Sequence, residues 1–204
     1  LDPEARAGVV VLTNREDADA HDIALRVMAA LHDAVLPAPA PAEALPEGIF
    51  AADTGPFWLR IAGNRATFLG AEEALYAHAG GWFASRSPTL PMRLRPAADG
   101  AIEGEIGHAA RRFRPVPANA AVDPEWSGEW LCPEQGAHVA IAEGAMTSGV
   151  GPLRETVRLQ PIGHGHALIE RRAGAWRQVA CLCFAGDTMR LVSNRSRMLQ
   201  FRRG

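Results

Sequence analysis

The amino-acid sequence predicts a mainly β protein, made of two consecutive eight-stranded antiparallel barrels preceded by one strand and one helix. Short apolar runs separated by turn residues recur from residue 48 to residue 204, with no helical periodicity among them. Eight such runs precede the proline-containing break at residues 115–120, and eight follow it. Before residue 36, the pattern is that of one buried strand and one amphipathic helix. Eight short strands with no helix between them are typical of a closed barrel or a sandwich.

The first 35 residues resemble a fragment of an α/β sheet. Gly8–Leu12 is an apolar, mostly β-branched run without alternation, which is typical of a strand covered on both faces. A helix is expected over Ala20–Asp33, because Ile23, Val27 and Leu31 recur every four residues. One helix can cover only one face of the strand. The pair therefore either decorates the barrels or belongs to a sheet whose remaining strands lie in a domain upstream.

Residues 36–47 separate this segment from the barrels and are rich in proline and alanine. Proline lacks a backbone N–H and fixes φ, so the stretch can form neither a helix nor an inner strand. We expect a polyproline-like linker. The predicted organisation is therefore a strand and helix in residues 1–35, a linker in 36–47, a first barrel in 48–116 and a second barrel in 117–204.

The expected strands are separated by turn residues, and Ile102–Ile106 alternates most clearly between apolar and charged positions. Those of the first barrel are Gly48–Ala52, Phe57–Ala62, Arg65–Leu69, Glu73–His78, Gly81–Ala84, Met92–Arg95, Ala101–Gly107 and Ala110–Pro115. Those of the second are Gly128–Cys132, Ala137–Glu143, Ala145–Ser148, Leu153–Leu159, His166–Arg172, Trp176–Phe184, Thr188–Val192 and Arg197–Arg202.

Weak similarity between the halves indicates a duplication. The matching pairs are Gly48-Ile49-Phe50 with Gly128-Glu129-Trp130, Leu59–Ala62 with Val139–Ala142, Met92-Arg93-Leu94 with Met189-Arg190-Leu191, and Phe113-Arg114 with Phe201-Arg202. Each match is short, so their common order carries more weight than any one of them.

Composition excludes several classes of function. A net charge of −2 and a pI of about 6.4 give no electrostatic basis for binding nucleic acid or an anionic membrane. No apolar run approaches the roughly 20 residues that cross a bilayer. Three cysteines are too few for a disulfide framework and fit a reducing compartment, so a cytoplasmic location is expected. Leu1-Asp2-Pro3 has no initiator Met and no signal core, so we expect a longer protein upstream.

The sequence offers no catalytic residue. All 21 basic residues are arginine, so a serine–lysine pair is impossible within this chain. A triad could be drawn from Ser148, His164 and Asp187, but no G-x-S-x-G elbow presents a serine. No cofactor is implied.

A metal site is a low-odds alternative to having none. His164 and His166 share one face of an expected strand, as do Cys181 and Cys183. A hairpin centred on Ala173-Gly174 would set His166 opposite Cys181 and His164 opposite Cys183, four ligands of the zinc type. Against this, the glycines around His164 indicate a turn, and cysteine is often a small core residue.

The segment Gly8–Arg15 (GVVVLTNR) and the helix after it resemble the end of the penicillin-recognising serine hydrolase fold, whose last strand reads like G-[IV]-V-x-L-x-N. With the linker and two barrels, the whole chain is similar to the C-terminal part of the D-stereospecific aminopeptidase branch. In that family the catalytic motifs S-x-x-K, Y-x-N and H-x-G lie upstream of this strand. Neither S-x-x-K nor Y-x-N occurs here, so no catalytic residue is carried over.

The resemblance implies accessory barrels of a hydrolase that releases N-terminal D-amino acids from peptides or amides. Its implied partners are the upstream catalytic domain, a second copy in a homodimer, and the substrate bound by that domain. It also implies a loop of the last barrel that restricts the cleft. The candidates are the turn at Ala173–Trp176 and the turn formed by Gln160, Pro161, Ile162, Gly163, His164, Gly165 and His166.

A different class of function remains open. Two lipocalin-like barrels could form a non-enzymatic protein that binds small ligands, since an eight-stranded barrel can hold one small molecule or be filled by side chains. A sizeable apolar cavity in either barrel would favour this alternative.

Overall fold

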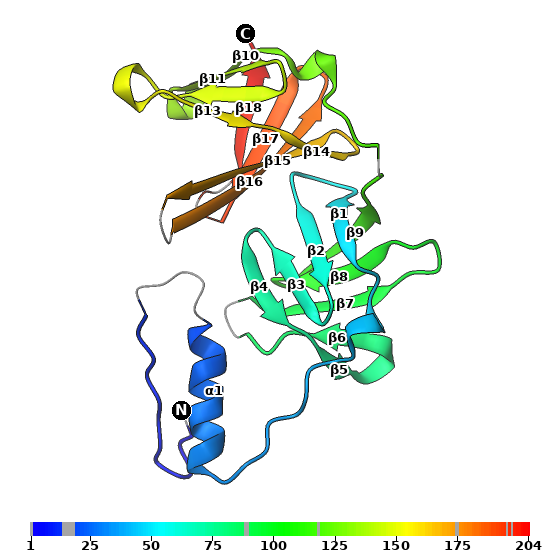
Figure 1. Ribbon diagram of the computed structural model, residues 1–204, viewed down its shortest axis with the longest axis vertical. Helices are drawn as coiled ribbons and strands as arrows, with labels where there is room; N and C mark the ends of the chain where they lie inside the picture. Colours follow the sequence, from blue (N-terminus) through cyan, green and yellow to red (C-terminus); the bar gives the residue numbers. More distant parts are fainter. Residues whose placement is uncertain are drawn as a thin grey trace.

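Two nine-stranded antiparallel sheets, each curled into a nearly closed barrel, make up most of the computed structural model (Figure 1). The structure describes residues 2–13, 19–87, 90–117, 119–173, 176–194, 196 and 198–204, without the side chains of 172, 173, 176 and 177. The predicted class, mainly β with two consecutive barrels, is confirmed. Each described sheet has nine strands where the sequence predicts eight.

The first barrel runs in the order β4-β3-β2-β1-β9-β8-β7-β6-β5. Its extra strand arises because the expected Glu73–His78 is interrupted at Leu75, whose side chain is buried and whose N–H bonds Asn64 O. The strands are β1 (Gly48–Ala52), β2 (Trp58–Ala62), β3 (Arg65–Phe68), β4 (Ala71–Ala74), β5 (Tyr76–His78), β6 (Trp82–Ala84), β7 (Met92–Pro96), β8 (Ile102–Ile106) and β9 (Ala109–Pro115).

The second barrel has the same order, β13-β12-β11-β10-β18-β17-β16-β15-β14. Its extra strand is β14 (Gln160–Gly163), where the sequence predicts a turn. The others are β10 (Gly128–Cys132), β11 (Ala137–Ala142), β12 (Ala145–Ser148), β13 (Glu155–Arg158), β15 (His166–Ala173), β16 (Trp176–Ala185), β17 (Thr188–Ser193) and β18 (Leu199–Arg203). Short 3-10 turns lie at Ala42–Ala44, Ala79–Gly81, Pro124–Trp126, Pro133–Gln135 and Gly151–Leu153.

The duplication is visible in the strand register. Gly48 pairs with Ile61 in the first barrel as Gly128 pairs with Ile141 in the second. Equivalent positions carry the Phe-Arg pairs that end β9 and β18. The Met-Arg-Leu match is wrong, however, because one copy lies in β7 and the other in β17, which corresponds to β8.

Large apolar side chains fill both barrels. Phe50, Leu59 and Phe113 are at most 2% exposed in the first barrel. In the second, Trp130 is fully buried and donates its indole N–H to Trp126 O at 2.9 Å. This agrees with the alternation along each strand, which directs every second residue inward.

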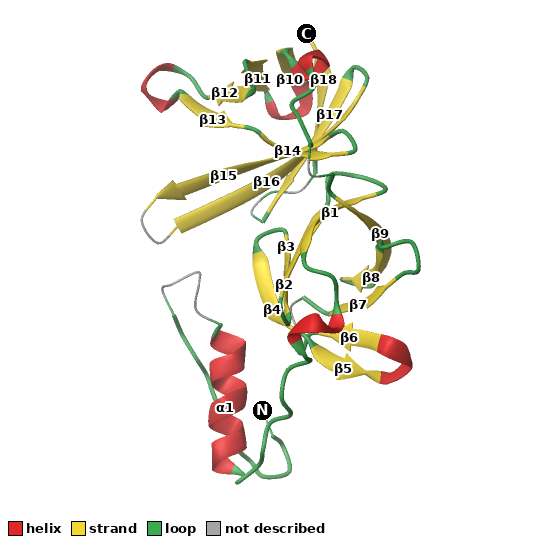
Figure 2. Ribbon diagram, turned by 45° about the vertical axis from the view of Figure 1, so that its right-hand side comes forward, coloured by secondary structure: helices red, strands yellow, loops and turns green. Residues whose placement is uncertain are grey.

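A third apolar cluster joins the two barrels and is called the seam below. At this junction β1 of the first barrel lies beside β14 of the second (Figure 2). Its buried members are Ala51 and Trp58 from the first barrel and Ile162, Leu168, Val179, Cys181 and Val192 from the second. On β16, Ala180 and Leu182 face the barrel core while Val179 and Cys181 face the seam. Strands buried on both faces read as continuous apolar runs rather than as alternating patterns.

The described residues of the N-terminal arm, 2–13 and 19–35, form one helix and no strand. Helix α1 (Ala20–Leu31) begins at Asp19, whose carboxylate accepts the Asp22 N–H at 2.9 Å, a standard N-cap. The helix prediction is confirmed. Gly8–Leu12 pair with no described strand, so the expected strand does not form within the described residues, and its partner sheet upstream stays a prediction. Residues 14–18 of the polar segment between them lie outside the described part.

The linker is attached to the first barrel in its second half, so it is not an extended spacer throughout. Ala40 N–H bonds Leu75 O at 2.8 Å, and Leu45 is 3% exposed within the first core. The Glu47 carboxylate accepts the Gly63 N–H at 2.8 Å. Within the described residues, no helix is long and apolar enough to cross a membrane.

Candidate functional site

The predicted gating turn lies at the seam between the barrels. Its first four residues form β14, and Ile162 is 1% exposed within the seam cluster. His164 is exposed at the tip of the β14–β15 turn with φ of 52°, and Gln160 is exposed at the start of β14. The expectation of a seven-residue turn is therefore corrected: the first four residues form a strand that begins at the exposed Gln160, and the exposed His164 lies in the short turn after that strand.

Close packing explains the two glycines beside His164. A Cβ on Gly163 would lie 2.7 Å from Pro117 Cδ, and one on Gly165 would lie 2.9 Å from Phe184 O. Both residues also have positive φ, where a side chain is strained. The turn is thus fixed against the barrel-to-barrel connection on one side and β16 on the other.

His166 links the barrels through its imidazole ring. Its Nδ1 lies 2.8 Å from His164 O, and its Nε2 lies 2.8 Å from Gly55 O in the β1–β2 turn of the first barrel. Carbonyl oxygens only accept hydrogen bonds, so both ring nitrogens donate at once only in the imidazolium form. The ring is 3% exposed, which makes this the one buried histidine among the described residues.

The protonation of His166 follows from opposing effects. Burial, the largest influence, disfavours the charged ring and lowers its pKa. The Cys183 side chain and the Gly55 and His164 carbonyls act the other way, and together they leave the pKa of His166 raised above its ordinary value. The ring therefore couples the barrel contact to pH.

The four-ligand metal arrangement does not form. In the observed register His166 lies opposite Cys183, and Cys181 lies opposite Leu168, two residues from the expected pairing. His164 sits in the turn rather than opposite a cysteine. Cys181 is wholly buried in the seam, where burial first and Cys183 second raise its thiol pKa well above normal. In the part of the chain that is described, no three metal-competent side chains gather.

The residues of the hypothetical triad occupy separate settings. Ser148 Oγ accepts a hydrogen bond from Arg171 at 2.9 Å, inside the second barrel. Asp187 lies 3.3 Å from Arg203 Nε, and His164 is exposed in its turn. The other candidate gating turn, Ala173–Trp176, includes residues 174 and 175 and lies partly outside the described residues.

Sequence reasoning missed the contribution of Gly55. This residue precedes His166 by 111 positions and acts through its backbone carbonyl, which leaves no signature in side-chain type. The residue types of Asp53-Thr54-Gly55-Pro56 indicate a turn, but they do not indicate that this turn contacts His166.

These features define a two-barrel protein with an apolar seam and an exposed helical arm. No protein-family model matches the chain, and no curated protein matches it.

Proposed function

We propose that this chain is the accessory C-terminal part of a serine D-aminopeptidase-like hydrolase, which releases N-terminal D-amino acids from peptides or amides. The barrels are structural and gate substrate access, and the serine and lysine of catalysis belong to an upstream catalytic domain. The observation that carries this proposal is the N-terminal arm, in which several large apolar side chains of the described residues are exposed.

The exposure of the arm is systematic. Val10 is 83% exposed and Leu12 is 92% exposed, although both lie in the most strand-like segment of the arm. The helical stripe Ile23, Val27 and Leu31 is between 42% and 62% exposed, and α1 buries none of its residues. Exposed apolar area costs about 25 cal/mol per Å² relative to burial, so these side chains favour a covering surface.

A sheet supplies the cover that both parts of the arm require. An unpaired apolar segment can add to a sheet edge through its backbone, and the following helix can pack its stripe on one face of the same sheet. This is the geometry of the last strand and helix of an α/β catalytic domain. The resemblance of GVVVLTNR to such a strand supports the same occupant.

The barrels are suited to hold an element beside a neighbouring site. Their shared apolar seam and the His166–Gly55 hydrogen bond fix one barrel against the other. A rigid support can exclude bulky substrates by shape without contributing chemistry. The exposed His164 side chain is the part of the β14–β15 turn available for such a contact.

The test compares the full-length polypeptide with residues 1–204 alone on a D-aminoacyl p-nitroanilide. We expect turnover only by the full-length protein, because activation of the serine needs a lysine that this chain lacks. Sedimentation should give a dimer for the full-length protein. Turnover by residues 1–204 that is sensitive to serine reagents, or a full-length protein without S-x-x-K, would overturn the proposal.

Gating is tested separately in the full-length enzyme with His164→Gly. Glycine tolerates the positive φ at this position, so the fold should persist. We expect kcat/KM for a bulky D-residue to rise about 3- to 10-fold relative to a small one, because contact with a side chain is removed.

The matched control for that variant is His108→Gly. His108 is also exposed, follows a glycine and has φ of 65°, but lies in the β8–β9 turn of the first barrel. It should leave the ratio unchanged. Equal effects of the two variants, or equal changes for small and bulky substrates, would contradict gating by the β14–β15 turn.

A further inference from the structure

The inner faces of three strands change from apolar to polar at the same end of the second barrel. On each of β12, β15 and β16, a buried apolar residue is two positions from a half-buried polar one, so both point inward. The pairs are Met146 and Ser148, Ile169 and Arg171, and Ala180 and Gln178. Ile169 is opposite Ala180, and Arg171 is opposite Gln178, so the change occurs at one level of the sheet.

These side chains line a cavity of about 210 Å³ that opens to solvent. Val139, Leu191 and Leu199 complete the apolar wall, and Ser196 adds a hydroxyl. Pockets for drug-sized ligands occupy roughly 300–1,000 Å³, so this cavity suits a smaller molecule. At about 30 Å³ per water, it has the space of about seven waters. Its floor is apolar and its polar groups are few.

Arg171 supplies the charge in this cavity. Its Nη2 donates to Ser148 Oγ at 2.9 Å, which orients the guanidinium across the gap between β15 and β12. Its Nε lies 3.2 Å from Glu155 Oε2, at an angle that makes an ion pair but not a hydrogen bond. This nitrogen is buried and has no hydrogen-bond acceptor among the described residues. A buried donor without an acceptor is unfavourable, and a ligand oxygen would relieve it.

We propose that this cavity binds a small aliphatic carboxylate. Its carboxylate would bond the Arg171 guanidinium, whose planar fork matches that group. Its alkyl chain would lie among Val139, Met146 and Ile169, which are at most 6% exposed. This site is independent of the arm and of the proposed hydrolase, and it gives the second barrel a ligand of its own.

The surrounding charges favour a monoanion with an apolar body. Glu155, half exposed at the mouth, offsets part of the Arg171 charge and repels every anion, so a monoanion is disfavoured less than a dianion such as phosphate. An aliphatic amine would place a second cation against the guanidinium. An uncharged alcohol would fill the apolar floor but would form no ion pair.

Hexanoate is the probe, with hexan-1-ol and hexylamine of the same chain length as controls. Isothermal titration calorimetry on the full chain should show hexanoate binding in the micromolar to millimolar range. We expect both controls to bind at least about tenfold more weakly, because neither pairs with Arg171. No hexanoate binding at about 10 mM, or equal binding of hexanoate and hexan-1-ol, overturns the proposal.

Two variants locate the site. Arg171→Gln should weaken hexanoate binding at least about tenfold, whereas Arg190→Gln, an exposed arginine on β17, should not. Ala180→Leu should block the cavity by filling it. Thermal unfolding checks that each variant folds, and unchanged hexanoate affinity in folded Ala180→Leu protein also overturns the proposal. The comparison of the three probes on the unmodified chain stands even if a variant fails to fold.

Discussion

His166 is a titratable group in the contact between the barrels, so its protonation bears on how that contact responds to pH. His166 donates to the carbonyls of Gly55 and His164 only when both ring nitrogens carry protons. Above its pKa the ring is neutral, so one ring nitrogen carries no proton and cannot donate a hydrogen bond to its carbonyl oxygen. Gly55 lies in the first barrel and His166 in the second, so loss of the proton weakens the attachment of one barrel to the other.

The first prediction at this scale is that stability falls as His166 loses its proton. Because the folded-state pKa is raised, this residue stabilises fully below its unfolded pKa of about 6.5, and the stabilisation is lost as the pH rises through the folded value. One proton limits the slope to about 1.4 kcal/mol per pH unit. Urea unfolding at a series of pH values measures it.

His166→Gln is the variant for comparison. It keeps polar atoms near the two carbonyls but does not titrate, so the slope between neutral and alkaline pH should disappear. His138→Gln is the control, since His138 lies on the surface beside Glu129. The same slope in wild type and His166→Gln would assign the pH dependence to other groups.

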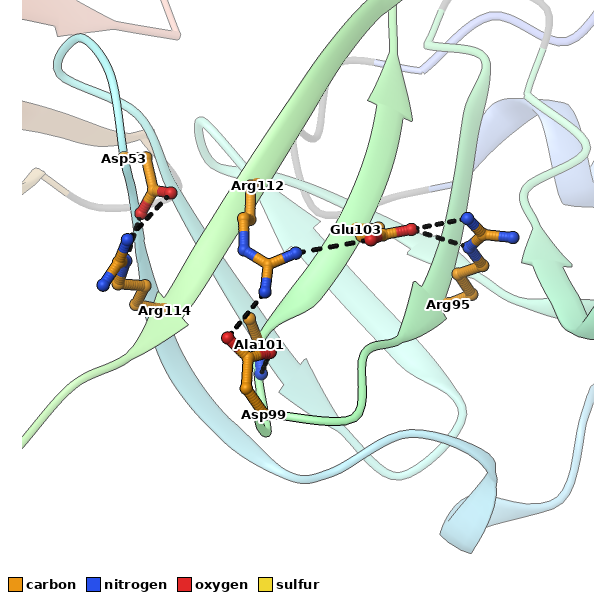
Figure 3. Close-up of polar contacts among 7 residues, drawn as sticks. All are labelled: Asp53, Arg95, Asp99, Ala101, Glu103, Arg112 and Arg114. Atoms are coloured by element: carbon orange, nitrogen blue, oxygen red, sulfur yellow. Dashed lines mark hydrogen bonds and ion pairs between the residues drawn. The ribbon is translucent and has the colours of Figure 1, made fainter.

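At the scale of elements, charged pairs on the outside of the first barrel link three neighbouring strands (Figure 3). Glu103 on β8 lies between Arg95 on β7 and Arg112 on β9, at 2.6 and 3.3 Å, and is opposite both in the sheet register. Arg112 also forms an ion pair at 2.6 Å with Asp99, which lies in the turn between β7 and β8. Opposite charges on adjacent strands stabilise that register.

Glu103→Gln should therefore lower the unfolding free energy by about 0.5–1 kcal/mol at low salt. The value is small because all three partners are partly exposed, and exposed ion pairs are screened by solvent. In about 1 M salt the loss should shrink, since the Debye length is then about 3 Å. Denaturant unfolding measures both. Glu134→Gln on the second barrel's surface is the control, and an equal loss there would contradict a specific role for Glu103.

At the scale of the whole molecule, the described part of the arm lies outside the apolar clusters of the barrels. The arm touches the first barrel through a hydrogen bond between His21 Nε2 and Arg86 O at 2.8 Å, but it adds no buried side chain to either core. The linker is different, because Leu45 belongs to the first core. The packed part of the first barrel therefore begins within the linker, residues 36–47, rather than after it.

Deleting residues 1–35 should consequently shift the unfolding midpoint of the barrels by no more than about 3 °C, which corresponds to less than about 1 kcal/mol for a chain of this size. Leu45→Ala, in contrast, should cost about 2–4 kcal/mol by leaving a cavity in the core. Differential scanning calorimetry compares the two. A large loss on deleting the arm would show that its apolar face packs on the barrels.

The sequence by itself determined the features that depend on local pattern. The helix at Ala20–Leu31 follows from a four-residue repeat and an Asp N-cap, and most strands follow from apolar runs between turn residues. The duplication followed from the ordered matches. One match, Met92–Leu94 with Met189–Leu191, lies in strands that do not correspond, and three residues can agree by chance. The arrangement of the gating candidates did not follow. Gly163 and Gly165 indicated a turn, whereas pairing with β15 made Gln160–Gly163 a strand.

The tertiary structure alone decided the register and the site. The β15–β16 hairpin is centred one residue later than expected, and a shift of one residue in a turn moves every cross-strand partner by two. That shift placed His166 opposite Cys183 and removed the metal arrangement. The seam, the His166–Gly55 bond and the cavity at Arg171 join residues far apart in the chain. Such contacts depend on how whole barrels pack, and no local periodicity encodes them.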